Sequence, residues 1–337
     1  MIYPSFLEEG SPIGVTAPSD GNSEELDYVR LDAAKLHLKE HGYPVLETSD
    51  VRTSEKARSA DGKTRAKELI SLWNHPDIRL IISAKGGDYL MEVLPFLDFD
   101  EMKKHPVWFQ GYSDNTGLTF LITTLCDMAS IYGNNFNDFG MEPWHQSLEQ
   151  NEAIWKGETV LQENFDFCEN QFHDRVTGLE GYHPDQKVCW RCFQEQTEPF
   201  SIKGRLLGGC LDVLLNLCGT RYDKVKEFVN RYKEDGIVWY LESFALGSEE
   251  LARGLWQLRE AGWFEYAKGF VFGRPCFFHS DTDTSYEEAV VSVLGTDLPM
   301  LFQTDIGHRG PQFAVVNGSI GTITYANGGG SLSMEFR

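Results

Sequence analysis

The sequence has little positive charge and no long apolar run. Its 337 residues include 30 lysines and arginines against 51 aspartates and glutamates, which gives a net charge of −21. A surface of that sign repels phosphate backbones and anionic lipid headgroups, so we expect neither nucleic acid nor a membrane as a partner. No apolar stretch reaches the roughly 18 residues that span a bilayer. The first residues also lack the basic start and apolar core of a signal peptide.

Cysteine is scarce as well, with seven residues at irregular spacing. An odd number in a chain large enough to fold without disulfides indicates reduced thiols, and therefore a cytoplasmic protein. Cys189 and Cys192 form a single C-x-x-C pair without a second pair, which favours structural thiols over a metal knuckle. Glycine and proline, at 32 and 13 residues, show no low-complexity bias, so a disordered or fibrous chain is excluded.

Short apolar runs alternate with helical patterns, which is typical of α/β folds. The chain exceeds the usual size of one core, so we expect two domains. The N-terminal α/β domain, residues 1–165, is expected to contain a parallel sheet, and 166–200 an acidic, aromatic-containing linker. A C-terminal α/β domain follows at residues 201–337. The strands expected to matter most end near residues 83, 109, 241 and 302, and a helix is expected at 209–217.

The strongest chemical signal is Phe109-Gln-Gly-Tyr-Ser-Asp-Asn-Thr116. It puts Ser113 on a sharp turn between a buried strand and a helix, where an exposed hydroxyl can attack a carbonyl carbon. The backbone N–H groups of the first helical turn point to where an oxyanion would form. The alternative is that Ser113 only caps the helix, because Ser-Asp-Asn-Thr is rich in capping residues.

A nucleophilic serine needs a base and an orienting acid. His308 lies in a glycine-flanked loop after an expected strand, although an ordinary loop histidine would fit the same pattern. Glu242 ends the run Ile-Val-Trp-Tyr-Leu, where an acid can also cap a helix or pair with a base. Ligands of open α/β sheets bind outside the carboxyl ends of the strands, and the Gly86-Gly87 loop follows a strand too. Glycines there let a backbone N–H approach a reacting oxygen, or simply make a tight turn.

We do not expect the one zinc-like motif of the sequence to bind zinc. His37-Leu-Lys-Glu-His41 matches an H-x-x-E-H pattern, but it ends a surface-type helix and no third ligand is evident. We expect no metal and no cofactor.

Taken together, the motifs resemble those of the serine LD-carboxypeptidases, a family that includes murein and microcin-immunity carboxypeptidases. The residues that carry the resemblance are Gly111-Tyr-Ser-Asp-Asn-Thr116, Gly204-Arg-Leu-Leu-Gly-Gly209, the strand ending in Glu242, and Asp305-Ile-Gly-His308. It extends over most of the chain, since Thr16-Ala-Pro18, Arg65, Lys85-Gly-Gly87 and Gly219-Thr220 also follow the family order.

The resemblance implies a flavodoxin-like N-terminal domain with helices on both faces of its sheet, and a separate C-terminal α/β domain. It implies a triad of Ser113, His308 and Glu242, with an oxyanion hole from the N–H groups of Asp114 and the Gly86-Gly87 loop. It also implies a cytoplasmic homodimer that needs no metal.

Two departures from the family pattern concern the substrate. Tyr132-Gly-Asn-Asn135 stands where the family commonly has Gly-Pro, and Cys210 where an Asn often follows the double glycine. The substrate is therefore left open between a murein tetrapeptide and a peptidyl- or aminoacyl-nucleotide of the microcin C type. Trp190 could stack on a nucleotide base, or it could pack against the sheet.

Cationic side chains near the site should help to capture an anionic substrate against the protein's own negative field. Lys85 and Arg309 are the candidates for contacting a carboxylate or phosphate, unless they only offset neighbouring acids. Two other functions remain open at this point. One is an α/β-hydrolase-type esterase, although Asn115 replaces the second glycine of its G-x-S-x-G turn. The other is a non-catalytic protein that binds a small molecule.

Overall fold

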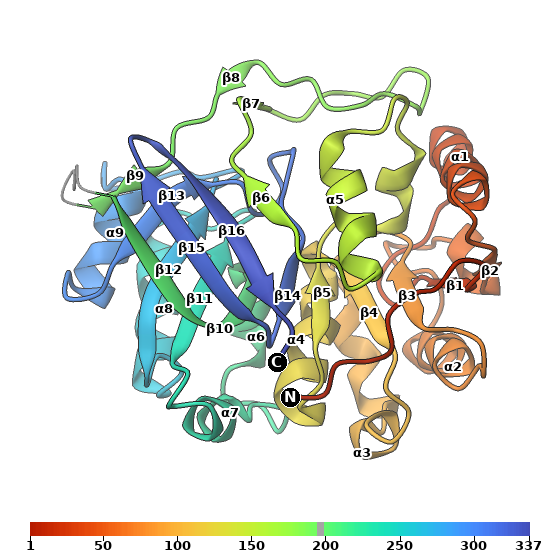
Figure 1. The fold of residues 1–337 in the computed structure, drawn as a ribbon, viewed down its shortest axis with the longest axis horizontal. Helices are drawn as coiled ribbons and strands as arrows, with labels where there is room; N and C mark the ends of the chain where they lie inside the picture. Colours follow the sequence, from red (N-terminus) through yellow and green to blue (C-terminus); the bar gives the residue numbers. More distant parts are fainter. Residues whose placement is uncertain (194–198) are drawn as a thin grey trace. The chain divides into compact units, whose positions relative to one another are not determined.

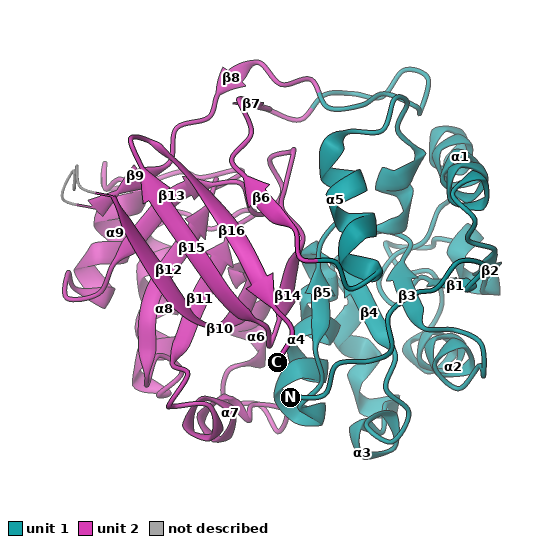
Figure 2. Ribbon diagram, in the orientation of Figure 1, with its two compact units in different colours: residues 1–158, 173–182 teal, residues 159–172, 183–337 magenta. Residues whose placement is uncertain are grey.

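The structure, a computed structural model, describes residues 1–193 and 199–337 (Figure 1). The chain divides into two compact units, shown in Figure 2. Unit 1 contains Met1–Glu158 and His173–Tyr182, and unit 2 contains Thr159–Phe172 and His183–Arg337. This division differs from the expected one at 165 and 200. The expected linker 166–200 is not a separate segment, because its described residues are shared between the two units; its residues 194–198 lie outside the described part.

Unit 1 is built on a parallel sheet with the strand order β2-β1-β3-β4-β5. The strands are β1 (Ile13–Thr16), β2 (Val45–Glu47), β3 (Leu80–Ser83), β4 (Trp108–Gly111) and β5 (Ser130–Tyr132). This is the flavodoxin-like order, so the expected fold of the N-terminal half is confirmed. All residues of β1, β3, β4 and β5 are buried, which explains why these strands are continuous apolar runs in the sequence.

Helices cover both faces of this sheet. They are α1 (Glu25–Glu40), α2 (Gly62–Trp73), α3 (Phe99–Met102), α4 (Thr116–Cys126) and α5 (Gln146–Trp155). Short 3₁₀ turns lie between them: η1 (Ser49–Arg52), η2 (Leu90–Glu92), η3 (Leu94–Phe96), η4 (Ser113–Asn115) and η5 (Phe136–Gly140). Figure 1 shows α1 and α5 on one side of the sheet and α2 and α3 on the other, as right-handed crossovers require.

The segment 173–182 belongs to unit 1 because a buried arginine binds it there. The guanidinium of Arg30, on α1, donates to the carbonyl oxygens of Gly178 and Glu180 at 3.1 and 2.7 Å. Its Nε donates to the carbonyl of Asn137 at 3.0 Å. Burial lowers the pKa of Arg30, but these carbonyl oxygens solvate the charge in place of water.

Unit 2 contains a mixed sheet with the order β6-β16-β15-β10-β11-β12-β13-β9. The strands are β6 (Leu161–Glu163), β9 (Arg191–Cys192), β10 (Phe200–Cys210), β11 (Ile237–Glu242), β12 (Ala267–Gly273), β13 (Met300–Thr304), β15 (Ile320–Ala326) and β16 (Gly329–Glu335). Strands β10 to β13 are mutually parallel, and the outer pairs are antiparallel. The carboxyl ends of β11, β12 and β13 therefore lie side by side at one edge.

The other elements of unit 2 are shorter. A two-stranded ribbon pairs β7 (Phe167–Cys168) with β8 (Gln186–Lys187), and β14 spans Val315–Asn317. The helices are α6 (Leu211–Leu217), α7 (Val225–Arg231), α8 (Ser248–Glu260) and α9 (Tyr286–Leu294). The expected helix at 209–217 begins two residues later, because the double glycine still belongs to β10. A Cβ on Gly208 would meet the carbonyl oxygen of Tyr240 at 1.7 Å, so only glycine lets these strands approach so closely.

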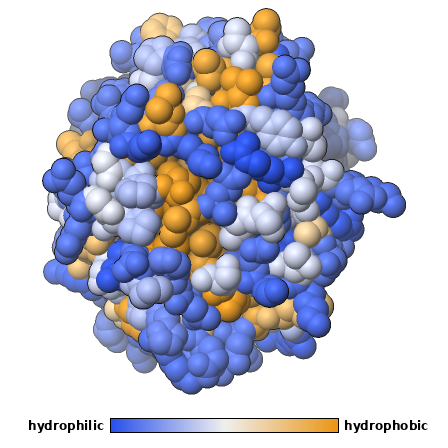
Figure 3. Space-filling view, turned by 90° about the vertical axis from the view of Figure 1, so that its right-hand side faces the viewer, coloured by the Kyte–Doolittle hydropathy of each residue, from blue (hydrophilic) through white to orange (hydrophobic). Residues whose placement is uncertain are grey.

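The hydrophilic character of the visible surface agrees with the excess of acidic residues in the sequence. Hydrophilic residues dominate the face shown in Figure 3, with apolar residues gathered in a band near its centre. All seven cysteines are free, as expected for reduced thiols. Among the described residues, no helix is both long and apolar enough to cross a membrane.

Candidate active site

Ser113 lies at the turn between β4 and α4, in a backbone conformation that is rare for a serine. Its φ is 64°, in the left-handed region, which costs a residue with a Cβ about 1–3 kcal/mol. Strain of this kind is typical of nucleophiles on strand-to-helix turns. Tyr112 is the N-cap of η4 and Asn115 the N-cap of α4. Ser113 is thus the N-cap of neither helix, which removes the basis for the capping alternative.

The Gly86-Gly87 loop approaches this serine within unit 1. A Cβ on Gly86 would lie 2.9 Å from both the Cβ and the Oγ of Ser113. A Cβ on Gly87 would lie 2.3 Å from the hydroxyl of Ser19. A side chain at either position would force its neighbours to move, and Gly86 brings a backbone segment against the hydroxyl group of Ser113.

Asp114 connects the nucleophile turn to two other loops. Its carboxylate accepts hydrogen bonds from the hydroxyl of Ser19 and, at 2.8 Å, from the backbone N–H of Leu90. Burial raises the pKa of Asp114, and these two hydrogen bonds act in the opposite direction. Buried Arg65, on α2, donates to the carbonyls of Ser19 and Tyr89 at 3.1 and 3.2 Å. The side chain of Asp114 is therefore structural. The group of Asp114 that we expect in the oxyanion hole is its backbone N–H.

Asn135 holds the other side of the turn, a role that the sequence did not suggest. Its side-chain oxygen accepts hydrogen bonds from the backbone N–H of Tyr112 and from the amide of Asn115, both at 3.2 Å. Asn115 also donates to the carbonyl of Lys85 at 3.0 Å. These contacts tie the strained turn to the loops after β3 and β5, so the conformation of Ser113 is over-determined by its surroundings.

In unit 2 the structure brings the expected base and acid together. His308 Nδ1 lies 2.9 Å from Glu242 Oε2, and the side chains are 6% and 0% exposed. Glu242 ends β11, and His308 follows β13, two strands away at the same sheet edge. A buried carboxylate at Nδ1 fixes the tautomer that leaves Nε2 as the proton acceptor.

Glycines make room for this pair. A Cβ on Gly307, whose φ is 103°, would lie 2.7 to 2.8 Å from the side chain of Glu242. A Cβ on Gly273 would meet the carbonyl oxygen of Ile306 at 2.1 Å. The loop that carries His308 can therefore lie against the acid only because both positions lack a side chain.

Cys210 is the third buried polar group at this edge. It is paired in register with Glu242, and one possible ligand atom each from Cys210, Glu242 and His308 lies within 4.8 Å of the others. These are the side chains in the described part of the chain that could together hold a metal ion. Burial, followed by the nearby Glu242, raises the pKa of the Cys210 thiol well above its usual range, so the thiol stays protonated.

The candidate substrate-binding residues differ in their surroundings. Lys85 lies 3.6 Å from a carboxylate oxygen of Asp20 and 3.3 Å from one of Asp27. These ion pairs match the alternative in which Lys85 offsets neighbouring acids. Trp190 is 2% exposed and donates to Asp305 at 2.7 Å. Of the two alternatives for Trp190, its burial matches packing against the sheet and not an exposed stacking surface.

The H-x-x-E-H pair has structural partners. His37 Nδ1 lies 2.9 Å from the carbonyl of Phe139, and its Nε2 lies 3.1 Å from a Glu142 oxygen. His41 Nδ1 lies 2.7 Å from a carboxylate oxygen of Glu152. The two imidazoles hold α1 to the η5–α5 region.

Three phenylalanines form an exposed cluster next to the base, which no motif in the sequence indicated. The ring of Phe244 lies 4.6 Å from that of His308. Phe277 and Phe172 follow, with ring centroids 5.1 Å from Phe244 and 5.5 Å from Phe277, respectively. Their exposed fractions are 37%, 53% and 50% for Phe244, Phe277 and Phe172. An aromatic surface of this kind is suited to bind a flat or apolar group.

Comparisons with known proteins identify the family of this chain. The family model of the LD-carboxypeptidase N-terminal domain matches residues 13–133, and that of the C-terminal domain matches residues 203–323. The chain belongs to the LD-carboxypeptidase family. This LD-carboxypeptidase is therefore a serine hydrolase and a peptidase, so the readings as an esterase of another fold or as a non-catalytic binding protein are set aside.

Curated relatives match nearly the whole LD-carboxypeptidase. It is 25% identical to a putative carboxypeptidase of Vibrio cholerae, over 97% of this chain and 96% of the relative. It is 23% identical to a probable murein peptide carboxypeptidase of Bacillus subtilis, over 94% and 89%. It is also 23% identical to the microcin C7 self-immunity protein MccF of Escherichia coli, over 98% and 93%.

Solved structures share the fold of the LD-carboxypeptidase. MccF in complex with glutamyl sulfamoyl guanosine matches with a TM-score of 0.80 at 20% identity, over 99% of this chain and 98% of that chain. An MccF-like protein from Bacillus anthracis matches with a TM-score of 0.81 at 22% identity, over the whole of both chains.

Proposed function

We propose that Ser113, His308 and Glu242 form a catalytic triad that hydrolyses an amide bond at the C-terminal end of a small peptide substrate. The observation that carries the proposal is the buried 2.9 Å contact between His308 and Glu242, which follow or end strands two positions apart at one sheet edge. The left-handed turn at Ser113 supports the role of nucleophile independently.

In the proposed reaction Ser113 Oγ attacks the substrate carbonyl carbon, and His308 Nε2 accepts the hydroxyl proton. Glu242 stays ionised and stabilises the imidazolium through Nδ1–H. The carbonyl C–N bond then breaks, and His308 returns the proton to the leaving amine. A water molecule, deprotonated by His308, attacks the acyl-enzyme and releases the second product together with free Ser113.

The backbone N–H groups of Asp114 and of the Gly86-Gly87 loop are proposed to bind the oxyanion. The close approach of Gly86 to the Ser113 hydroxyl supports this, since donors must lie about 3 Å from the developing charge. Removing one such donor typically costs a factor of about 10² to 10³ in rate.

Two substrates are compatible with this chemistry, a murein tetrapeptide and a peptidyl- or aminoacyl-nucleotide. The exposed cluster of Phe172, Phe244 and Phe277 beside His308 favours the second. A D-alanine leaving group has only a methyl side chain, whereas a nucleobase offers a flat surface for stacking. The microcin immunity relative solved with glutamyl sulfamoyl guanosine is consistent with that choice.

The function is tested by incubating wild-type protein and Ser113→Ala with murein tetrapeptide and with aspartyl sulfamoyl adenosine, and by identifying products with mass spectrometry. The variant should stay folded and lose about 10⁴-fold or more of the turnover. It should also lose labelling by a fluorophosphonate. If Ser113→Ala keeps a tenth of the wild-type rate with an unchanged melting curve, the proposed nucleophile is wrong.

We also propose that the LD-carboxypeptidase works as a homodimer in the cytoplasm. The free cysteines are consistent with a reducing compartment, and the dimer rests on the family resemblance. Light scattering coupled to gel filtration tests the dimer, and a mass of about one chain would contradict it.

A further inference from the structure

Unit 2 contains a cavity of about 400 Å³ whose charged lining residues are all basic. Its lining includes Asn170, Gln186, Lys187, Arg191, Arg274 and Arg309. In a protein with a net charge of −21, a group of cations without an acid among them requires an explanation. None of the proposed triad residues lines this cavity, although Arg309, which follows His308 in the chain, does.

Arg274 forms the buried wall of the cavity. Its side chain is 3% exposed and follows β12. One terminal nitrogen donates to Asp305 at 2.6 Å, and the other donates to the carbonyls of Arg309 and Pro311 at 2.7 and 2.9 Å. The Nε–H group is buried and has no hydrogen-bond partner. This group has almost no accessible surface, so Arg274 contributes its positive charge to the cavity and not a hydrogen bond from Nε.

Arg309 is bound to the rest of unit 2 by neutral acceptors only. Its Nε donates to the carbonyl of Glu169 at 3.0 Å, and NH2 donates to the side-chain oxygens of Asn170 and Gln186 at 3.1 and 2.7 Å. These acceptors hold the guanidinium in place but leave its charge uncompensated. Within the described ranges, no carboxylate lies in ion-pair distance of Arg309 or of exposed Lys187.

The other charged side chains around the cavity have partners of their own. Arg191 is 64% exposed and pairs with Glu287 at 3.0 Å, so it belongs to the rim. Asp305 is engaged by Arg274, and Asp185 accepts a hydrogen bond from the backbone N–H of Asn170. Burial raises the pKa of the Cys168 thiol in the lining; Arg274 and Arg309 lower it, each with more effect than Asp305 or Asp185. The cations therefore dominate the electrostatic potential at this thiol.

We propose that this cavity binds an anion of the phosphate class, with the Arg309 guanidinium and the Lys187 ammonium group as its donors and the buried charge of Arg274 behind them. Guanidinium groups bind phosphate oxygens with strong, directional hydrogen bonds, and a lysine adds a mobile positive charge. One water molecule takes about 30 Å³ of liquid volume. On that scale the cavity, at about 400 Å³, exceeds the volume of a phosphate ion several-fold. The cavity therefore has room for a phosphate monoester with a small organic group.

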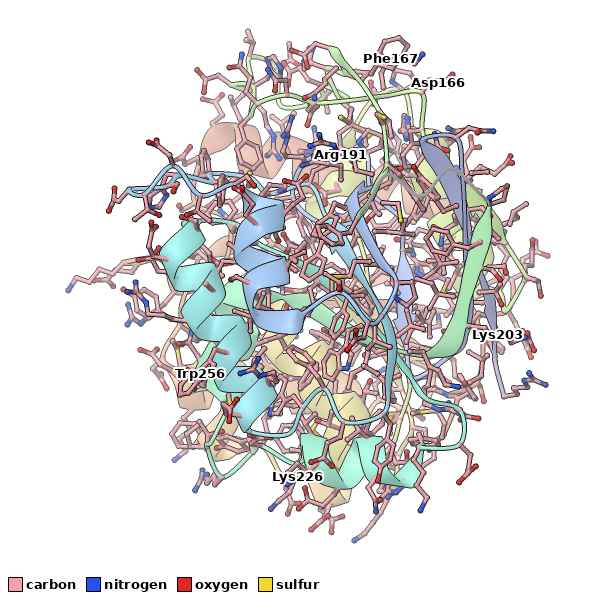
Figure 4. The ribbon with its side chains drawn as sticks, turned by 90° about the vertical axis from the view of Figure 1, so that its left-hand side faces the viewer. Asp166, Phe167, Arg191, Lys203, Lys226 and Trp256 are labelled. Carbon is pink, nitrogen blue, oxygen red and sulfur yellow. The ribbon has the colours of Figure 1, made fainter. Side chains whose placement is uncertain are left out.

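Isothermal titration calorimetry at low ionic strength tests the proposal with inorganic phosphate, phenyl phosphate and benzoate as probes. The variants are Lys187→Gln and Arg309→Gln. Lys226→Gln is the matched control, because it removes one surface charge of unit 2 where Lys226 pairs with Glu265 at 3.5 Å. Figure 4 shows that Lys226 lies far from Arg191, the labelled residue of the cavity rim.

We expect wild-type protein to bind phosphate or phenyl phosphate, and each cavity variant to weaken that binding about 10-fold or more, while Lys226→Gln changes it less than 2-fold. Tighter binding of phenyl phosphate points to an organic ester as the ligand, and equal binding points to inorganic phosphate. Lys187 is exposed, so its variant tests the site even if Arg309→Gln fails to fold. Absence of binding at 10 mM probe, equal effects of Lys187→Gln and Lys226→Gln, or benzoate bound as tightly as phenyl phosphate would each overturn the proposal. The readout does not depend on hydrolysis.

Discussion

Replacing Gly86 by alanine is the sharpest test of the proposed oxyanion loop, because it changes one methyl group at one place. The new Cβ would lie 2.9 Å from Ser113 Cβ and Oγ. Ordinary contacts of a Cβ begin near 3.4 Å, so the serine or the loop must move by about 0.5 Å. The backbone of Gly86 is not in the left-handed region, and alanine therefore adds no conformational strain there.

The rate effect follows from that displacement. A misplacement of about 1 Å at a reacting group can cost 10²-fold, so about 0.5 Å should lower kcat/KM by roughly 10- to 100-fold. In free energy this is about 1.4 to 2.7 kcal/mol of lost transition-state stabilisation. The loop is half-buried and the methyl group is small, so the melting temperature should change little.

Gly181→Ala is the matched control within the same unit. A Cβ there has only the carbonyl oxygen of Pro143 near it, at 3.9 Å, and the φ of Gly181 is also ordinary. Both variants should be assayed for kcat/KM and for the rate of fluorophosphonate labelling. If Gly86→Ala matches Gly181→Ala in both measurements, the loop does not act on the nucleophile.

Three further predictions concern the base, the pH dependence of stability and metal removal. His308→Ala combined with Glu242→Gln should lower kcat little more than the worse single variant, because Glu242 acts through His308; additive losses would assign them to separate sites. Burial raises the pKa of Asp50 to about 6 from 3.8, so the folded state holds this proton more tightly than the unfolded chain. The stability cost of ionising Asp50 is absent below about pH 4, grows as the pH rises to about 6 and then stays near 3 kcal/mol. Asp50→Asn should therefore gain stability over wild type between pH 4 and 6 in urea unfolding, and a pH-independent difference would contradict this. Activity should survive EDTA, since the proposed triad needs no metal; inactivation reversed by added zinc would assign the ligand cluster of Cys210, Glu242 and His308 to a metal instead.

The sequence predicted that Glu242 and His308 lie close together, because buried parallel strands appear as continuous apolar runs. Glu242 and His308 follow such runs, and the carboxyl ends of parallel strands share one sheet edge. The Glu242–His308 contact confirms this reasoning. Asn135 and Arg274 were missed because their roles depend on backbone atoms 23 or more residues away, and no local pattern marks such partners.

Helix α5 was missed for a different reason. It lies in a stretch that lacks long apolar runs, and its buried face includes a polar residue, Asn151. This side chain exchanges hydrogen bonds with buried Gln110 of β4 at 2.9 and 3.0 Å, and Trp155 donates to the same glutamine. A helix that buries amides against a sheet has the composition of an exposed helix, so hydrophobic periodicity does not detect it.

The hydrogen bonds of Arg30 have a consequence for anyone who wants to produce unit 1 alone. A fragment that ends at residue 158 keeps all five strands of the sheet but loses Gly178 and Glu180, whose carbonyls bind the guanidinium. The guanidinium would then lose two of its acceptors, and the segment that shields it from water would be absent. Such a truncation should be poorly soluble, whereas a version that carries residues 173–182 back on a short glycine-rich linker should fold. We therefore expect that residues 13–133, the segment matched by the N-terminal family model, would not fold stably alone.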